Sequence, residues 1–181
     1  MRLAPVEHPT NPLIRLAYYF SRRQLGKVVT PLRVFYARKP RLLALASHIG
    51  WTMEHGLSLD PEIRFLVLAQ AARLNGCAFC HDLSLASAIR ARLGTERFAS
   101  LDEYRTSPLF SERERAALAM SEEATTDRRV TEATWTALRA HFSETEIVEF
   151  IWVNAAENYF NLQATTMGFE SEGLAAMAAA K

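Results

Sequence analysis

The 181-residue chain has few of the features that assign a protein to a specialised class. No window approaches the roughly 18 consecutive apolar residues of a membrane-spanning helix, so we expect no membrane segment. The formal net charge of +1 gives no reason to expect nucleic acid as a partner. There are only two cysteines and no targeting segment, so we expect a cytoplasmic protein whose thiols can be reduced. Its 49% hydrophobic and 23% charged residues are typical of an ordinary globular domain.

Both cysteines lie in one short stretch, Leu74 to His81, with two residues between them. Such a pair can close a small disulfide loop or cycle between dithiol and disulfide. Asn75-Gly76 is a turn signal, and it places Cys77 near the first turn of the next helix, where the positive helix end favours a thiolate. We therefore treat Cys77 and Cys80 as candidate catalytic residues.

Two other interpretations of the cysteine pair compete with redox chemistry. Zinc normally takes four ligands, and without a third cysteine the site would need His48, His55 or His81. The run from Cys77 to His81 also matches the attachment sequence of a c-type haem, which requires export. We expect neither a metal nor another cofactor.

The run from Pro61 to Ser84, which contains the cysteine pair, resembles the core of the alkylhydroperoxidase D and carboxymuconolactone decarboxylase superfamily. The resemblance is strong from about Pro61 to Gly94 and weaker through residues 111–120 and 142–149. It implies an all-α fold, usually a homo-oligomer, in which the cysteine-bearing branch reduces peroxides or disulfides. The family's proton relay has a glutamate twelve residues before the first cysteine and a histidine four after the second. Here those positions hold Phe65 and Ser84.

Hydrophobic periodicity predicts about six to eight helices. The resemblance implies that they form a single alkylhydroperoxidase D-like domain. Asp60-Pro61 and capping boxes at Ser111 and Ser143 predict helix starts, and Gly168 predicts the end of the last long helix. We expect an N-terminal arm and first helix in residues 1–40 and the helical domain in residues 41–170. The alanine-rich tail, residues 171–181, is expected to be a loose helix or disordered.

The last long helix carries a polar stripe on an otherwise apolar body. We expect its apolar residues, among them Ile151, Tyr159 and Leu162, to be buried. The stripe could face water, a partner chain or a pocket near the cysteines, and it consists of Asn154, Glu157, Asn158, Asn161 and Thr165.

The missing relay residues change which cysteine we expect to attack. Ser84 can hydrogen-bond Cys80 but cannot titrate near neutral pH. His81 stands four residues after Cys77, on the same helix face, so we predict that Cys77 is the attacking thiol and His81 its base. Glu62 is a candidate for steadying His81. Glu157 and Asn161 are candidate pocket residues.

Three functions are compatible with the sequence. The first is a thiol-dependent oxidoreductase, a peroxidase or disulfide reductase that cycles Cys77 and Cys80 with a peroxide or a partner protein's disulfide or thiol. The second is a lyase acting on a small lactone-like molecule, but that branch of the superfamily uses no cysteine pair. The third is a non-catalytic assembly module or redox switch. For all three we expect a homo-oligomer.

Overall fold

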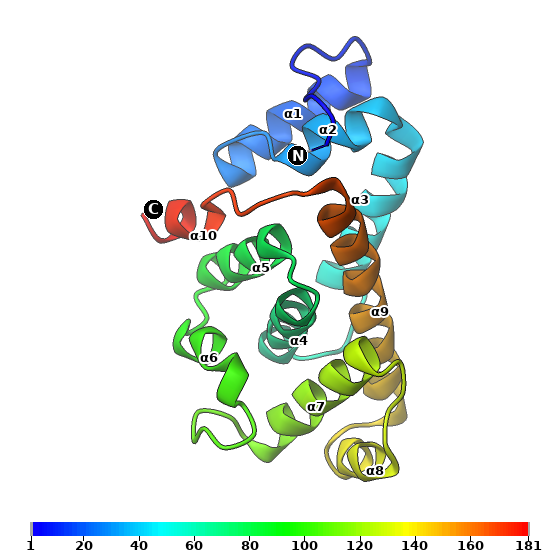
Figure 1. Cartoon of the computed structure of the whole chain (residues 1–181), viewed down its shortest axis with the longest axis vertical. Coiled ribbons are helices and arrows are strands. Elements are labelled where there is room, and N and C mark those ends of the chain that lie inside the picture. The colour runs from blue at the N-terminus through cyan, green and yellow to red at the C-terminus, as the bar shows by residue number, and fades with distance from the viewer. Residues whose placement is uncertain (1, 181) are drawn as a thin grey trace.

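Every regular element in the part of the chain that the structure describes, residues 2–180 of a computed structural model, is helical (Figure 1). This confirms the all-α prediction. The described chain has ten α-helices, more than the six to eight expected, because three segments of four to six residues also form helices. None of these helices combines the length and apolarity needed to span a bilayer. The first five are α1 (Pro12–Leu25), α2 (Thr30–Val34), α3 (Pro40–His55), α4 (Pro61–Leu74) and α5 (Ala78–Arg90). The others are α6 (Glu96–Ala99), α7 (Glu112–Thr126), α8 (Glu132–His141), α9 (Glu144–Met167) and α10 (Leu174–Ala179).

Helix ends follow the capping signals in the sequence. Asp60 accepts a hydrogen bond from the backbone N–H of Glu62 at 2.8 Å, which begins α4. Both predicted capping boxes form, at Ser111 before α7 and at Ser143 before α9. Gly168 ends α9 with φ +68°, a conformation that costs glycine little. Each of these interactions lies within a few residues of sequence, which is why they could be predicted.

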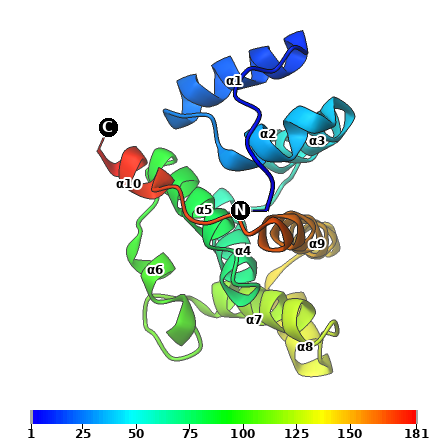
Figure 2. The ribbon, with the colours of Figure 1, turned by 45° about the horizontal axis from the view of Figure 1, so that its top comes forward.

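Helix α4 lies at the centre of the molecule, with α5, α7 and α9 packed around it (Figures 1 and 2). Its side chains at Leu66, Val67 and Ala69 are fully buried, as its nearly uniform apolar sequence predicts. Gln70 is also fully buried, and its Oε1 accepts hydrogen bonds from Arg73 at 3.2 and 3.3 Å. The centre of the fold is therefore the helix that leads directly into the cysteine pair.

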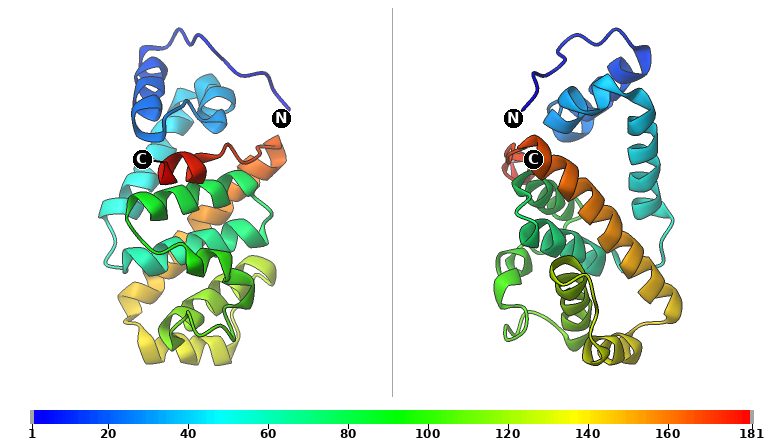
Figure 3. Two further views of the ribbon diagram at one scale, coloured as in Figure 1. Left: turned by 90° about the vertical axis from the view of Figure 1, so that its left-hand side faces the viewer. Right: turned by 45° about the vertical axis from the view of Figure 1, so that its right-hand side comes forward.

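Helices α1 and α2 lie at one end of the molecule, and α3 runs from that end along one side of it (Figure 3). We call these three helices together the α1–α3 layer. The first two of them bury a small core of their own, made of Ile14, Tyr18, Val28 and Leu32. This layer faces the ends of α4, α5 and α9 across a cavity described below.

The C-terminal tail is an ordered helix docked on α5. Leu174 is fully buried there, and the carboxylate of Asp82 on α5 holds the segment in place. Asp82 accepts hydrogen bonds at 2.9 Å from the hydroxyl of Ser171 and from the backbone N–H groups of Glu172, Leu174 and Ala175. Of the two states expected for the tail, the structure has the helix, because Asp82 satisfies the N–H groups at its start.

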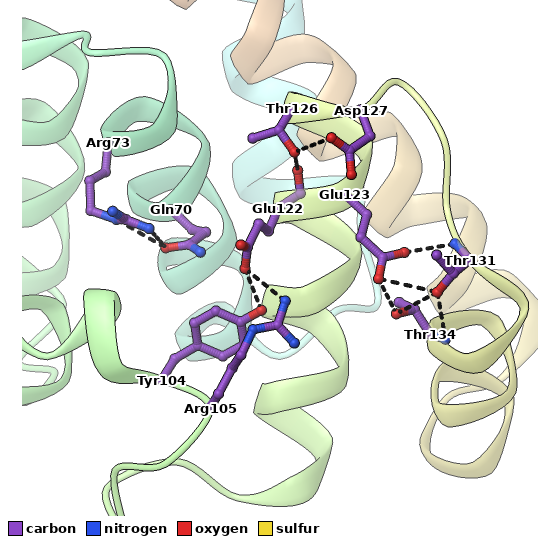
Figure 4. A network of polar contacts seen from close by, with 10 residues as sticks. All are labelled: Gln70, Arg73, Tyr104, Arg105, Glu122, Glu123, Thr126, Asp127, Thr131 and Thr134. Carbon is purple, nitrogen blue, oxygen red and sulfur yellow. Dashed lines mark hydrogen bonds and ion pairs between the residues drawn. The ribbon is translucent and has the colours of Figure 1, made fainter.

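Two neighbouring glutamates on α7 connect that helix to its surroundings (Figure 4). Glu123 accepts hydrogen bonds from the backbone N–H of Thr131 at 2.7 Å and from the hydroxyl of Thr134 at 2.6 Å, which joins α7 to α8. Glu122 accepts one from the hydroxyl of Tyr104 at 2.6 Å, which joins α7 to the preceding loop. These contacts fix the end of the molecule opposite the α1–α3 layer.

Helix α9 buries part of its predicted apolar body together with three residues of its polar stripe. Ile147, Phe150 and Val153 are buried, as predicted. Its polar stripe is turned inward: Asn154 is 4% exposed, Glu157 is 7% exposed and Asn161 is fully buried. An apolar strip is turned outward instead, with exposed fractions from 37% to 69%, made of Val148, Ile151, Trp152, Tyr159 and Leu162. The prediction that Ile151, Tyr159 and Leu162 are buried is therefore wrong. The inward orientation is stabilised by polar partners on other helices, which helical periodicity alone does not reveal.

Candidate active site

The cysteine pair closes a disulfide at the start of α5. The S–S distance is 2.06 Å, and the two Cα atoms are 5.3 Å apart. Gly76 has φ +64°, which lets the chain reverse after α4 so that the backbone N–H of Cys77 bonds the Ala72 carbonyl at 2.8 Å. Cys77 is the N-cap of α5, and its Sγ accepts a hydrogen bond from the backbone N–H of Cys80 at 3.2 Å. The predicted turn and the place of Cys77 at the positive helix end are both confirmed.

Beside the pair lies a cavity of about 650 Å³ between the α1–α3 layer and helices α4, α5 and α9. Its walls are mainly leucine, phenylalanine and other apolar side chains. Cys80, Ser84 and Glu157 line it, whereas Cys77 is 1% exposed and does not. The volume is within the range of about 300–1,000 Å³ found for small-molecule sites. A molecule in this cavity would therefore contact Cys80.

Glu157 contributes a carboxyl group to the same cavity. It is 7% exposed, and its Oε1 accepts a hydrogen bond from the Asn161 side-chain amide at 2.6 Å. Burial raises the pKa of Glu157 to about 7, against the opposing effect of that hydrogen bond. A carboxyl group with this pKa can give or take a proton at neutral pH, as the family's relay glutamate would. It comes from α9, whereas Phe65 occupies the relay position on α4 and also lines the cavity.

The buried amides of the stripe connect Glu157 to the turn before the cysteines. The side-chain amide of Asn75 donates to the Oδ1 atoms of Asn158 at 2.9 Å and Asn161 at 3.0 Å. At the other end, Ser121 donates to Asn154 at 2.8 Å, which ties the stripe to α7. Of the three environments considered for the stripe, the structure supports the pocket for Glu157 and rules out exposure to water for Asn161.

The other predicted site residues lie at different places. Ser84 is 7% exposed and lines the cavity one turn after Cys80. His81 is half-buried and is not among the residues lining the cavity. Burial lowers the pKa of His81 and Arg73 acts in the same direction, while Asp82 is the leading opposing charge. Glu62 is ion-paired with Arg97 on α6, so its carboxylate is engaged away from His81.

The histidines considered for zinc do not gather around the cysteines. His48 and His55 are exposed on α3, on either side of Trp51. Within residues 2–180 no three histidine, cysteine, aspartate or glutamate side chains are grouped closely enough to hold a metal ion.

Comparisons with known proteins place this site in a family. No family model matches the chain. The uncharacterised protein YnjA of Escherichia coli is 30% identical over 164 residues, which is 90% of each chain. A solved structure from Agrobacterium tumefaciens, described as of unknown function and as a candidate antioxidant defence protein AhpD, is 26% identical. Its TM-score is 0.71, over 77% of this chain and 97% of that one. The chain belongs to the alkylhydroperoxidase D-like superfamily.

One solved structure matches the fold of nearly the whole chain. The debrominase Bmp8 has a TM-score of 0.83 over 98% of this chain and 96% of its own, at 18% identity. At that identity the likeness concerns the fold alone. The match includes the α1–α3 layer, so the wall of the cavity formed by these helices is part of the shared fold.

One polar residue of the cavity, Arg64, was not identified as a site residue from the sequence. It is 7% exposed and lines the cavity from α4. The available signal was its position inside the apolar run Ile63–Ala72, where a charged residue needs a specific reason to be buried.

Proposed function

We propose that the protein is a thiol-dependent peroxidase that reduces organic hydroperoxides through Cys80 and Cys77. The observation that carries the proposal is the cavity, whose mainly apolar lining includes both Cys80 and Glu157. An apolar cavity of this size suits an organic hydroperoxide better than hydrogen peroxide, because it buries a hydrocarbon body beside the thiol.

The reaction begins with the reduced pair. The Cys80 thiolate attacks the terminal oxygen of the hydroperoxide, the O–O bond breaks, and the leaving alkoxide takes a proton from Glu157 to become an alcohol. Cys80 is then a sulfenic acid. The Cys77 thiol attacks its sulfur, which releases water and forms the disulfide present in the structure. A dithiol reductant, oxidised in turn to its own disulfide, returns the pair to the reduced state.

The choice of Cys80 as the attacking thiol differs from the sequence-based prediction of Cys77 with His81. Two observations support the choice: Cys80 lines the cavity, and Glu157 lines it too. Cys77 retains the advantage of the helix N-terminus, and His81 follows it by one turn. The two assignments give different labelling patterns, so an experiment can distinguish them.

The test is peroxidase turnover together with thiol labelling. Reduced protein is given cumene hydroperoxide and dithiothreitol, and rapid alkylation at pH 6 is mapped by mass spectrometry. We expect turnover to be lost in Cys80→Ser and Cys77→Ser, and Cys80 to be labelled first. Labelling of Cys77 first, with a rate that falls in His81→Ala, would support the sequence-based assignment instead.

The role of Glu157 needs a matched control. Glu157→Gln keeps the acceptor for Asn161 but cannot transfer a proton, and we expect turnover to fall by about 10²-fold or more, the low end of general acid–base contributions. Glu170→Gln removes an exposed carboxylate near the end of the same helix and should turn over normally. Equal rates in the two variants would exclude Glu157 as the proton donor.

A further inference from the structure

Arg64 is the one basic side chain in the buried part of the described residues, and it lines the cavity beside Cys80. Its side chain makes one hydrogen bond there, from Nη1 to the backbone carbonyl of Met53. The guanidinium carbon also lies 5.0 Å from the centre of the Phe65 ring. None of the ion pairs among residues 2–180 includes Arg64.

Neither Nε nor Nη2 of Arg64 has a hydrogen-bond partner in the protein, and neither is among the fully buried unpaired atoms, so both can be reached by solvent or by a small molecule. A guanidinium has five N–H donors, and burying it is costly unless an anion or several acceptors compensate. Burial lowers the pKa of Arg64, and Glu54 is the charge that opposes this effect. Glu54 itself is exposed at the cavity edge, so the chain supplies no buried counterion. An anion that enters the cavity can therefore provide the counterion that the chain does not.

The rest of the lining limits what that anion can be. Arg64 is the only lysine, arginine or histidine among the residues that line the cavity. The cavity can therefore neutralise a ligand with one negative charge but not a ligand with two. The guanidinium fork fits the two oxygens of a carboxylate. The surrounding wall is mainly leucine and phenylalanine, which favours an apolar body attached to that charge.

We propose that the cavity binds an apolar monocarboxylate, with Arg64 pairing with its carboxylate. If the protein is the peroxidase proposed above, its preferred substrate is then a hydroperoxide of a fatty-acid-like carboxylic acid. Glu157 favours this ligand while it is protonated, because a neutral carboxyl does not repel the bound carboxylate.

Binding can be tested without turnover, using the disulfide form and two ligands that differ only in the charged group. Isothermal titration calorimetry compares decanoate with decanol. We expect the wild-type protein to bind decanoate more tightly. Arg64→Met should lower the affinity for decanoate about ten- to hundredfold, because a charged hydrogen-bonded pair is lost. Its affinity for decanol should stay unchanged. Arg64→Lys keeps the charge and should recover part of the affinity.

Arg41→Met is the matched control, because Arg41 is an exposed arginine on α3 that does not line the cavity. It should bind decanoate as the wild type does. Equal or undetectable binding of both ligands by the wild type would overturn the proposal. If Arg64→Met lost as much affinity for decanol as for decanoate, the proposal would also be overturned, because Arg64 would then act only through the structure of the cavity.

Kinetics separate this proposal from the proposed peroxidase activity. In Arg64→Met, KM for a carboxylated hydroperoxide should rise while KM for cumene hydroperoxide stays the same. If the wild type reduces neither hydroperoxide, the peroxidase proposal fails, and the decanoate titration still decides whether a carboxylate site exists.

Discussion

The buried carboxyl of Glu157 should make the protein less stable as the pH rises. Its pKa is about 7 in the folded protein and near 4.5 in the unfolded chain. Between these values the folded state holds a proton that the unfolded state has lost, so the free energy of unfolding falls with increasing pH. The difference of about 2.5 pKa units corresponds to about 3 kcal/mol, fully expressed above about pH 8. Ionising this buried group therefore costs a large fraction of a typical domain's stability.

Glu157→Gln removes the titration and keeps the oxygen that accepts from Asn161. The oxidised proteins are unfolded in urea at pH 5, 6, 7 and 8. Relative to wild type, we expect the variant to gain stability steadily from pH 5 to pH 8, by up to about 3 kcal/mol. Glu170→Gln, which removes an exposed carboxylate, should show no such trend. A constant difference between Glu157→Gln and wild type at all four pH values would refute the reasoning.

Three further predictions concern stability and assembly. Asp82→Asn should destabilise the C-terminal segment by about 1–3 kcal/mol, seen as faster proteolysis near α10, because Asp82 accepts four hydrogen bonds. The pKa of Asp82 is lowered by those bonds, although its burial opposes them, so its contribution should disappear only as the pH falls through that lowered pKa. Leu66→Ala, at a fully buried position in α4, should cost about 2–5 kcal/mol in urea unfolding. The homo-oligomer expected from the sequence should appear in light scattering, and Leu162→Glu, in the exposed apolar strip of α9, should reduce its size; a wild-type monomer would contradict this expectation.

Local signals explain why so much of the fold could be predicted. The N-caps at Asp60, Ser111 and Ser143 depend on neighbours within three residues, and each helix begins where its cap predicts. The central place of α4 followed from its lack of a polar face. The short helices α2, α6 and α10 raise the number of helices above the six to eight expected, because so few residues carry no reliable period. For α10, contacts with the distant residue Asp82 decide the structure.

The candidate site was predictable in its cysteines and not in its surroundings. The spacing of Cys77 and Cys80 is a local feature, whereas the inward turn of α9 depends on partners such as Asn75, 83 and 86 residues away from the amides it contacts. Hydrophobic patterning predicted the reverse orientation for Ile151 and Leu162. Glu157 was recognisable as part of a polar stripe, but its raised pKa depends on burial that only the folded structure provides.

The amide chain that supports Glu157 has a direction. An amide donates from its nitrogen and accepts at its oxygen, so the order from Asn75 through Asn161 to Glu157 cannot be reversed without flipping every member. Oε1 of Glu157 is occupied as the acceptor at the end of this chain. A carbonyl oxygen is a stronger acceptor than a hydroxyl oxygen, so in the neutral acid this hydrogen bond favours the proton on Oε2. The two oxygens of one carboxyl thus have separate tasks: one anchors the side chain to α9, and the other carries the transferable hydrogen.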